Sequence, residues 1–316
     1  MRKNLVGRYV QHVGWCLLAV ALTTSCNISV PGSGTNGGGS GIASIAASLL
    51  EQLSLERINR ARLKPTAEAA AAGIALNEGV PAGSEMTADP KQPLALNASL
   101  NLAAQEHSQD MLTRDYFEHN SLEGTTPFQR ITNAGYAYTS AGENLAWRGS
   151  TGVLDEVQTV EEEHTDLFVD AGVSDRGHRT TMLNEAFREV GISAMVGSYT
   201  DAGTTYNAVM QTQDYGTPPS GSTFVLGVVY TDANANGQYD YGEGSAGADV
   251  TLAGVTKNTN VAGGFSFEVS QAGTYTLRFA TGHTQTLTIQ TGDRNVKVDL
   301  VDGLNVVVNL GVGVLN

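Results

Sequence analysis

The last third of the chain, residues 222–316, consists of short apolar runs separated by turn residues, and this pattern restricts the fold most. The runs are rich in β-branched and aromatic residues and cover residues 224–230, 249–252, 265–269, 274–279, 285–289 and 296–300. Short runs of this composition between turn residues predict strands rather than helices. We therefore expect a small all-β sandwich in this region.

The preceding region has a different pattern. Ile45, Leu49 and Leu53 recur every fourth residue and predict a helix that continues to Pro65. Helical patterns also begin near Asn97 or Ser99, which are candidate caps, and at residue 154, whereas residues 190–199 and 206–215 have strand composition. The predicted fold class is therefore α+β for residues 45–215, followed by a linker, residues 216–221, and the all-β domain, residues 222–316. A length of 316 residues agrees with two domains.

The N-terminus predicts export. Arg2, Lys3 and Arg8 flank an apolar run over residues 10–22, which is shorter than the roughly 20 residues of a spanning helix. Residues 1–25 are predicted to be a signal peptide. Ser25 before Cys26 favours lipidation at Cys26, with ordinary secretion as the alternative. Residues 26–44 are rich in Gly and Ser and predict a flexible tether.

These features place the mature protein outside the cytoplasm, as an outer-membrane or cell-surface lipoprotein or as a secreted protein, with the lipid as its only membrane anchor. The only other cysteine, Cys16, lies in the signal, so no disulfide is expected within one mature chain. With 18 Lys and Arg against 32 Asp and Glu, the net charge of −14 argues against nucleic acid as a partner.

Three short segments carry the candidate site chemistry. His119 and His178 follow or begin predicted helices, and Glu143 stands between Gly142 and Asn144 in a predicted loop. Imidazole and carboxylate groups bind divalent metals or transfer protons near neutral pH. If these segments converge they form one polar site; the alternative is that each residue caps a helix or orders a loop.

The same segments resemble the CAP superfamily of cysteine-rich secretory, antigen 5 and pathogenesis-related proteins, in its bacterial SCP-like form. The matching motifs are Leu55-x-x-x-Asn59-x-x-Arg62, Ala104–Met111 with Tyr116–Ser121, Gly135-Tyr136 with Gly142–Ala146, and Gly177-His178-Arg179-x-x-Met182-Leu183. The resemblance covers roughly residues 45–215. It implies an α-β-α sandwich whose central cleft is lined by two His and two Glu, and residues 66–92 look like an insertion.

The resemblance suggests that the fourth cleft residue lies in the run Glu161-Glu162-Glu163, where spacing favours Glu163 and an exposed acidic helix face is the alternative. His107 lies on an apolar helix face and is predicted to be a core histidine. His164 is predicted to be exposed on a polar helix, with a role as a ligand as the alternative. Arg176 and Arg179 are predicted to fix the loop around His178.

A second candidate site is a twelve-residue loop with the ligand pattern of a calcium loop. Oxygen ligands are expected on alternate residues, with a glycine at the sixth position and a final carboxylate. The predicted ligands are Asp232, Asn234, Asn236, the carbonyl of Gln238, Asp240 and Glu243. Because strands flank the loop, we expect a structural ion rather than a helical calcium sensor; a turn without metal is the alternative. This region resembles the transthyretin-like, carboxypeptidase-regulatory type domains of bacterial surface proteins.

The sequence therefore predicts an anchored CAP protein that binds a small or lipidic ligand, or an envelope partner, in a His/Glu cleft, with a calcium-stabilised β-domain as a spacer or adhesive module. No Gly-x-Ser-x-Gly, no His-Glu-x-x-His and no free mature cysteine other than Cys26 is present, so nucleophilic catalysis has little support. One alternative is a hydrolase that uses zinc or another divalent metal in the cleft. The other is a surface adhesion or scaffold protein.

Overall fold

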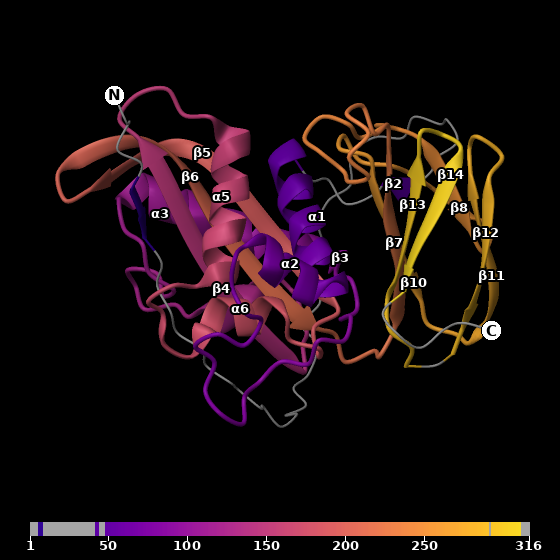
Figure 1. Cartoon of the computed structure of the whole chain (residues 1–316), viewed down its shortest axis with the longest axis horizontal. Helices are drawn as coiled ribbons and strands as arrows, with labels where there is room; N and C mark the ends of the chain where they lie inside the picture. Colours follow the sequence, from indigo (N-terminus) through magenta and orange to yellow (C-terminus); the bar gives the residue numbers. More distant parts are fainter. Residues whose placement is uncertain (1–5, 9–41, 44–47, 291, 311–316) are drawn as a thin grey trace, which may run out of the picture.

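The computed structural model describes residues 6–8, 42–43, 48–290 and 292–310 (Figure 1). Cys26 and most of the predicted signal and tether lie outside the described residues, so those predictions stay predictions. Among the residues described, no helix combines the length and apolar character needed to cross a membrane.

The helices of the first region begin where the sequence supplies caps. Ser48 and Glu51 form a capping box at the start of α1, and the Asn97 side chain accepts two backbone N–H groups at the start of α3, as predicted. Pro65 ends α1 and opens α2. The helices are α1 (Leu49–Leu63), α2 (Pro65–Ala71), α3 (Ala98–Arg114), α4 (Pro127–Asn133), α5 (Glu156–Val169), η1 (Ser174–Arg176) and α6 (Gly177–Met182).

A five-stranded sheet in the order β1-β4-β6-β5-β3 forms the centre of this region. Its central strands β4, β6 and β5 are antiparallel, and β3 pairs with β5 in parallel. The strands are β1 (Val6–Arg8), β3 (Ala95–Leu96), β4 (Ser140–Ser150), β5 (Glu189–Asp201) and β6 (Thr204–Thr217).

Helices cover both faces of this sheet (Figure 1). A Cβ atom on Gly191 would lie 2.0 Å from the backbone carbon of Leu100, so α3 lies directly against one face of β5. The next residue, Ile192, packs on the opposite face in a core shared with Leu55 and Ile58 of α1. Because side chains alternate along a strand, α3 and α1 lie on opposite faces of the sheet.

The C-terminal region contains two sheets, in the orders β10-β7-β13-β14 and β12-β11-β8-β9-β2. Val225, Phe267 and Val298 of the first sheet share a buried core with Val250 and Leu277 of the second. All six predicted strands are present, and β9, β14 and β2 are additional, of which β2 lies in the predicted tether. The strands are β2 (Ile42–Ala43), β7 (Thr223–Tyr230), β8 (Asp249–Leu252), β9 (Val255–Asn258), β10 (Gly264–Val269), β11 (Gly273–Phe279), β12 (Thr284–Ile289), β13 (Val296–Val301) and β14 (Asn305–Leu310).

The two regions lie side by side (Figure 1), and β7 accounts for the contact. Every residue of β7 is buried, which means that both faces of this strand are covered. Val225 and Val229 face the inner core, whereas Phe224 and Leu226 pack with Ala95 of β3. The first region thus covers the outer face of the sheet, and the connection from β6 to β7 spans only residues 218–222.

Candidate functional site

His119 and Glu143 come together in the structure. The Nδ1 atom of His119 lies 2.7 Å from Oε1 of Glu143, and both side chains are buried. The other carboxylate oxygen, Oε2, accepts a hydrogen bond at 2.5 Å from the guanidinium of Arg130 on α4. Arg130 also donates to the carbonyl of His119 at 2.8 Å. Glu143 therefore lies between an imidazole and a guanidinium.

Glu143 lies in strand β4 and not in the loop that the sequence predicted. Pairing with β6 along its whole length overrides the weak strand propensity of Gly142 and Asn144. Burial opposes ionisation of Glu143, but the charge of Arg130 and the hydrogen bond of His119 outweigh it and lower the pKa of Glu143 to about 2. The carboxylate is already neutralised by protein groups, so the contacts at Glu143 do not favour a divalent metal.

Asp214 of β6 is a member of this site that the sequence reasoning missed. It stands directly opposite Glu143 in the β4–β6 register, so the two side chains share one face of the sheet. Asp214 is fully buried, and no hydrogen-bond donor among the described residues reaches either of its oxygens. Burial, followed by the charge of Glu143, raises the pKa of Asp214 well above its usual range. Asp214 is therefore a neutral acid beside a carboxylate.

A cavity of about 210 Å³ adjoins His119 and Glu143. Its walls combine aromatic rings, threonine and serine hydroxyls and asparagine amides from segments far apart in the sequence. The remaining lining residues are Asn120, Thr126, Pro127, Phe128, Ser140, Ala141, Gly142, Thr180, Thr181, Asn184 and Phe187. The cavity therefore offers both apolar surface and hydrogen-bonding groups.

His178 has a separate carboxylate partner. Its Nδ1 atom lies 2.7 Å from Oδ1 of Asp170, and Asp170 also accepts the backbone N–H of His178 at 2.9 Å. Asp170 ends α5 in the left-handed conformation, which positions its carboxylate at the start of α6. Thr180 and Thr181 of the same helix line the cavity, but His178 is not among the described residues that line it.

Glu163 points into the interior between α5 and the sheet. It is fully buried, and its Oε2 atom accepts a hydrogen bond from Gln211 of β6 at 3.0 Å. Burial raises the pKa of Glu163 well above its usual range and so favours the protonated side chain. Glu163 also does not belong to the lining of the cavity. Of the four predicted cleft residues, the structure joins His119 with Glu143 and gives His178 and Glu163 other partners.

His107, His164 and Arg179 are all buried in this region of the chain. His107 is a buried core histidine bonded to the carbonyl of Glu118 at 3.0 Å, as predicted, and burial lowers its pKa to about 4. The prediction that His164 is exposed is wrong, because it is buried and lies 2.9 Å from a carboxylate oxygen of Glu68 on α2. Arg179 fixes its loop, as predicted, by donating to backbone carbonyls of α5 and of residues 76–78.

The predicted calcium loop lies between β7 and the residues that lead to β8. Three positions have positive φ, Ala235 at 56°, Gly237 at 75° and Gly242 at 86°, and the two glycines adopt this conformation without strain. The Asp232 carboxylate accepts the backbone N–H of Gly237 at 2.8 Å, and the Glu243 carboxylate accepts those of Ala233 and Asp240. The flanks are strand and turn, which agrees with the expectation that excluded a helix-loop-helix site.

In the part of the chain that the structure describes, no three His, Cys, Asp or Glu side chains are arranged to hold a metal ion. An ion in this loop would therefore also need oxygens from Asn234, Asn236 and the Gln238 carbonyl. The donor atoms that the loop can supply are all oxygens, which is the chemistry that calcium prefers.

Residues 55–215 match the model of the CAP family, the cysteine-rich secretory protein family. The match spans about half of the chain and includes most of α1, the helices α2 to α6, the strands β3, β4 and β5, most of β6 and the residues that line the cavity. This chain therefore belongs to the CAP family.

A curated relative is the uncharacterized protein YkwD of Bacillus subtilis (strain 168), which is 33% identical over 101 residues. The alignment covers 32% of this chain and 34% of that relative, so the chain spans about a third of its length. Among solved structures, an extracellular protein containing a SCP domain from Bacillus anthracis str. Ames is 24% identical, with a TM-score of 0.29, over 40% of this chain and 34% of that chain. An outer surface protein from Borrelia burgdorferi is 18% identical, with a TM-score of 0.29, over 40% and 77% of the two chains.

Proposed function

We propose that this protein is an extracytoplasmic CAP protein that binds a small, uncharged ligand with an apolar part, or an envelope component that carries such a group. The observation that carries the proposal is the cavity of about 210 Å³ beside His119 and Glu143. Phe128 and Phe187 supply apolar surface there. Because Arg130 and His119 neutralise Glu143, the cavity favours an uncharged ligand. We assign the helix-covered sheet to the α-β-α sandwich that the CAP resemblance implies.

The proposal is tested by NMR titration of the full chain with 1-octanol, a probe with a hydroxyl group and a short apolar chain. We expect saturable shifts at residues that line the cavity. Thr181→Trp fills the cavity and should abolish the shifts, whereas Val153→Trp, at an exposed loop position, should leave them unchanged. Equal shifts in both variants would show that the probe binds elsewhere.

A hydrolase acting on peptides or envelope material is the second candidate. It is favoured by two histidine–carboxylate pairs, His119 with Glu143 and His178 with Asp170, near the cavity. Such pairs orient an imidazole for general-base chemistry or for a metal such as zinc, although Arg130 makes Glu143 a poor metal ligand. Activity lost in folded His119→Ala and His178→Ala variants would support a hydrolase, and activity retained in both would exclude this site.

We also propose that the C-terminal region is a transthyretin-like β-sandwich with a structural calcium ion in its loop. The ligands would be Asp232, Asn234, Asn236, the Gln238 carbonyl, Asp240 and Glu243. A bound ion would cross-link the loop and supply no chemistry beyond that. Chelation with EGTA should lower the melting temperature of the full chain, and calcium but not magnesium should restore it. A melting temperature that does not respond to chelation would exclude the ion.

The destination of the chain is proposed from its N-terminal sequence. We propose removal of residues 1–25, lipidation at Cys26 and display at the outer membrane or cell surface, with the C-terminal region as a spacer or adhesive module. Metabolic labelling with a palmitate analogue should mark the wild type and not Cys26→Ser. Release of the wild type into the medium without label would favour ordinary secretion. If the full chain attaches to matrix equally well without residues 222–316, the C-terminal region is not the adhesive module.

A further inference from the structure

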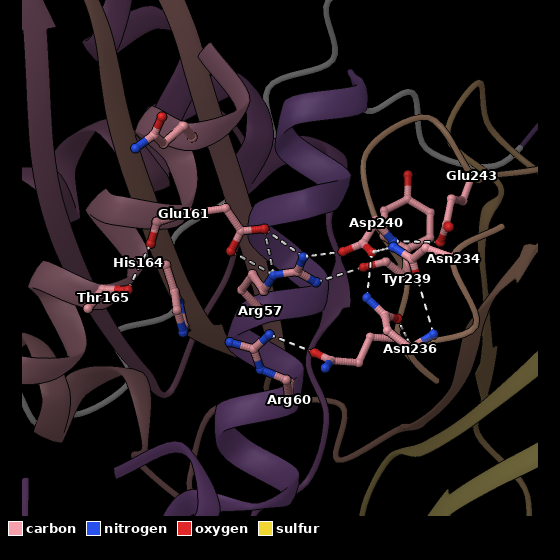
Figure 2. A network of polar contacts seen from close by, with 12 residues as sticks. Arg57, Arg60, Glu161, His164, Thr165, Asn234, Asn236, Tyr239, Asp240 and Glu243 are labelled. Atoms are coloured by element: carbon pink, nitrogen blue, oxygen red, sulfur yellow. Dashed lines mark hydrogen bonds and ion pairs between the residues drawn. The ribbon is translucent and has the colours of Figure 1, made fainter. Parts of the chain in front are cut away.

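Arg57 of α1 lies at the junction between the CAP domain and the C-terminal region (Figure 2). Its side chain is only 5% exposed, and its guanidinium donates to partners in both regions. On one side, Nε and Nη2 bond the carboxylate of Glu161 on α5 at 2.6 to 2.9 Å. On the other side, Nη1 bonds the carbonyl of Tyr239 and Nη2 bonds Oδ1 of Asp240, both at 2.7 Å. One buried cation therefore joins the two regions.

Asp240 is shared between this junction and the predicted calcium loop. While Arg57 holds Oδ1, the other oxygen, Oδ2, accepts the side-chain amides of Asn234 and Asn236, each at 2.7 Å (Figure 2). Three of the predicted ligands are thus linked in one hydrogen-bond network to α1. A change in the position of Asp240 must therefore affect the loop and the junction together.

Further contacts extend the junction along the same helix. Arg60, close to Arg57 on α1, donates to the side chain of Gln238 in the loop at 2.8 Å. Glu56 bonds the buried ammonium of Lys297 on β13 at 2.9 Å. Residues three and four apart lie on one face of a helix, so α1 presents a continuous polar face to the C-terminal region. The loop is fixed against this face at several points.

The charges determine whether Arg57 would help or oppose a cation in the loop. An isolated guanidinium beside Asp240 would repel a divalent ion. Here Glu161 pairs with Arg57 through both of its oxygens, so the Arg57–Glu161 pair has no net charge. What remains is the orienting effect of two donors, which hold Tyr239 and Asp240 in place. Preorganisation of a ligand lowers the free-energy cost of binding.

We propose that the contact between Arg57 and Asp240 couples cation binding in the loop of residues 232–243 to the seating of the C-terminal region on the CAP domain, so that each stabilises the other. This inference rests on the calcium site proposed above for the ion, but the contact itself is independent of the ion. Coupling between two sites is reciprocal, so whatever Arg57 adds to calcium affinity, calcium adds to the stability of the junction.

The first experiment is calorimetric titration of the full chain with calcium chloride. Typical couplings change affinity by about 5- to 150-fold, and we expect Arg57→Gln to weaken calcium binding roughly tenfold. Amide exchange gives the reciprocal measurement. Calcium should slow exchange in α1 of the wild type and should have a much smaller effect in Arg57→Gln.

A second variant covers the case in which loss of buried Arg57 prevents folding. Glu161 belongs to α5, its side chain is 35% exposed, and it lies across Arg57 from the loop. Glu161→Gln leaves Asp240 as the carboxylate that balances the charge of Arg57, so it should also weaken calcium binding. The matched control is Arg148→Gln, which removes an arginine paired with Glu162 and Asp166 of the same helix, away from the loop. The control should bind calcium as the wild type does.

The outcomes separate this inference from the calcium proposal. Calcium binding that is equally tight in the wild type, Arg57→Gln and Glu161→Gln would overturn the coupling and leave the calcium site intact. If the wild type binds no calcium, the calcium proposal fails. Amide exchange of residues 232–243, measured in EGTA, then tests whether the contact between Arg57 and Asp240 stabilises the loop. Faster exchange in Arg57→Gln or Glu161→Gln but not in Arg148→Gln would support a contact between loop and junction, and unchanged exchange would overturn it.

Discussion

Glu143 of β4 and Asp214 of β6 face each other across the central antiparallel pair, both buried, and only Glu143 has charged partners. Two adjacent carboxylates in a buried site cannot both ionise without a second cation. Arg130 and His119 stabilise the charge of Glu143, so Asp214 holds its proton. The carboxylate of Glu143, which lines the candidate cavity, thus lies beside a neutral acid, and the two residues should respond very differently to substitution.

Glu143→Gln should lower the free energy of unfolding by about 3–5 kcal/mol, because it leaves the largely buried guanidinium of Arg130 without its carboxylate. Urea denaturation of the full chain measures this loss. Asp214→Asn is the control, since it replaces a neutral acid by a neutral amide of the same shape, and should cost less than about 1 kcal/mol. If Asp214→Asn is as destabilising as Glu143→Gln, Asp214 is not a neutral acid.

Glu163 should make stability fall as pH rises. Its folded-state pKa is raised by burial, so the folded chain keeps a proton that the unfolded chain loses above about pH 4.3. Below that pH both states are protonated and the full stability is present. Above it, the free energy of unfolding falls by up to about 1.4 kcal/mol per pH unit until the folded-state pKa is reached.

Glu163→Gln removes this titration and keeps an acceptor for Gln211. Its stability relative to the wild type should therefore grow between about pH 4.3 and neutral pH in urea denaturation. Glu156→Gln, at an exposed position of the same helix, should show no such trend. A constant difference between Glu163→Gln and the wild type across this range would contradict a buried neutral Glu163.

Lys297→Met should be strongly destabilising. The Lys297 side chain is 4% exposed, and its ammonium contacts Glu56 of α1 and Asp299 of β13, which together outweigh burial and raise the pKa of Lys297. Its removal leaves two buried carboxylates without a cation, which should lower the free energy of unfolding by about 3–5 kcal/mol. Combining Lys297→Met with Glu56→Gln should cost less than the sum of the single losses, measured as a double-mutant cycle by urea denaturation. Strict additivity would mean that the pair does not interact across the junction.

Arg179→Met should loosen residues 74–80 before it affects the rest of the domain. The fully buried guanidinium donates to the carbonyls of Phe168, Val169 and Leu76 at 2.6 to 2.7 Å. Without the guanidinium these buried carbonyls lose their charged donors, and the free energy of unfolding should fall by at least about 3 kcal/mol. Amide exchange should rise first in residues 74–80. Arg278→Met, at an exposed position, is the control, and equal exchange in both variants would argue against this role.

Features set by neighbouring residues were predictable. Asn97 caps α3 because its side chain reaches N–H groups two and three residues away. The C-terminal strands were predicted from short apolar runs between turn residues. The burial of His107 was predicted from its place on an apolar helix face. The membership of residues 55–215 in the CAP family was also visible, because its motifs occur together in order.

Features that depend on distant parts of the chain were not predictable. Glu143 looked like a loop residue, and the sheet made it a strand residue through its pairing with β6. Arg130, Asp170 and Asp214 have no local signal that marks them as partners of the site. His164 was expected in solvent because its helix is polar, but Glu68 of α2 covers it.

The sequence by itself determined the start of α3, the six predicted strands of the C-terminal region and the family motifs, because those depend on short-range hydrogen bonds and on side-chain spacing. Only the tertiary structure decided which charges are paired. Arg57 could have been a surface residue of α1, and it is buried because α5 and the loop of the C-terminal region close around it. Burial and pairing depend on segments that meet in space, and the local sequence around a residue does not specify those segments.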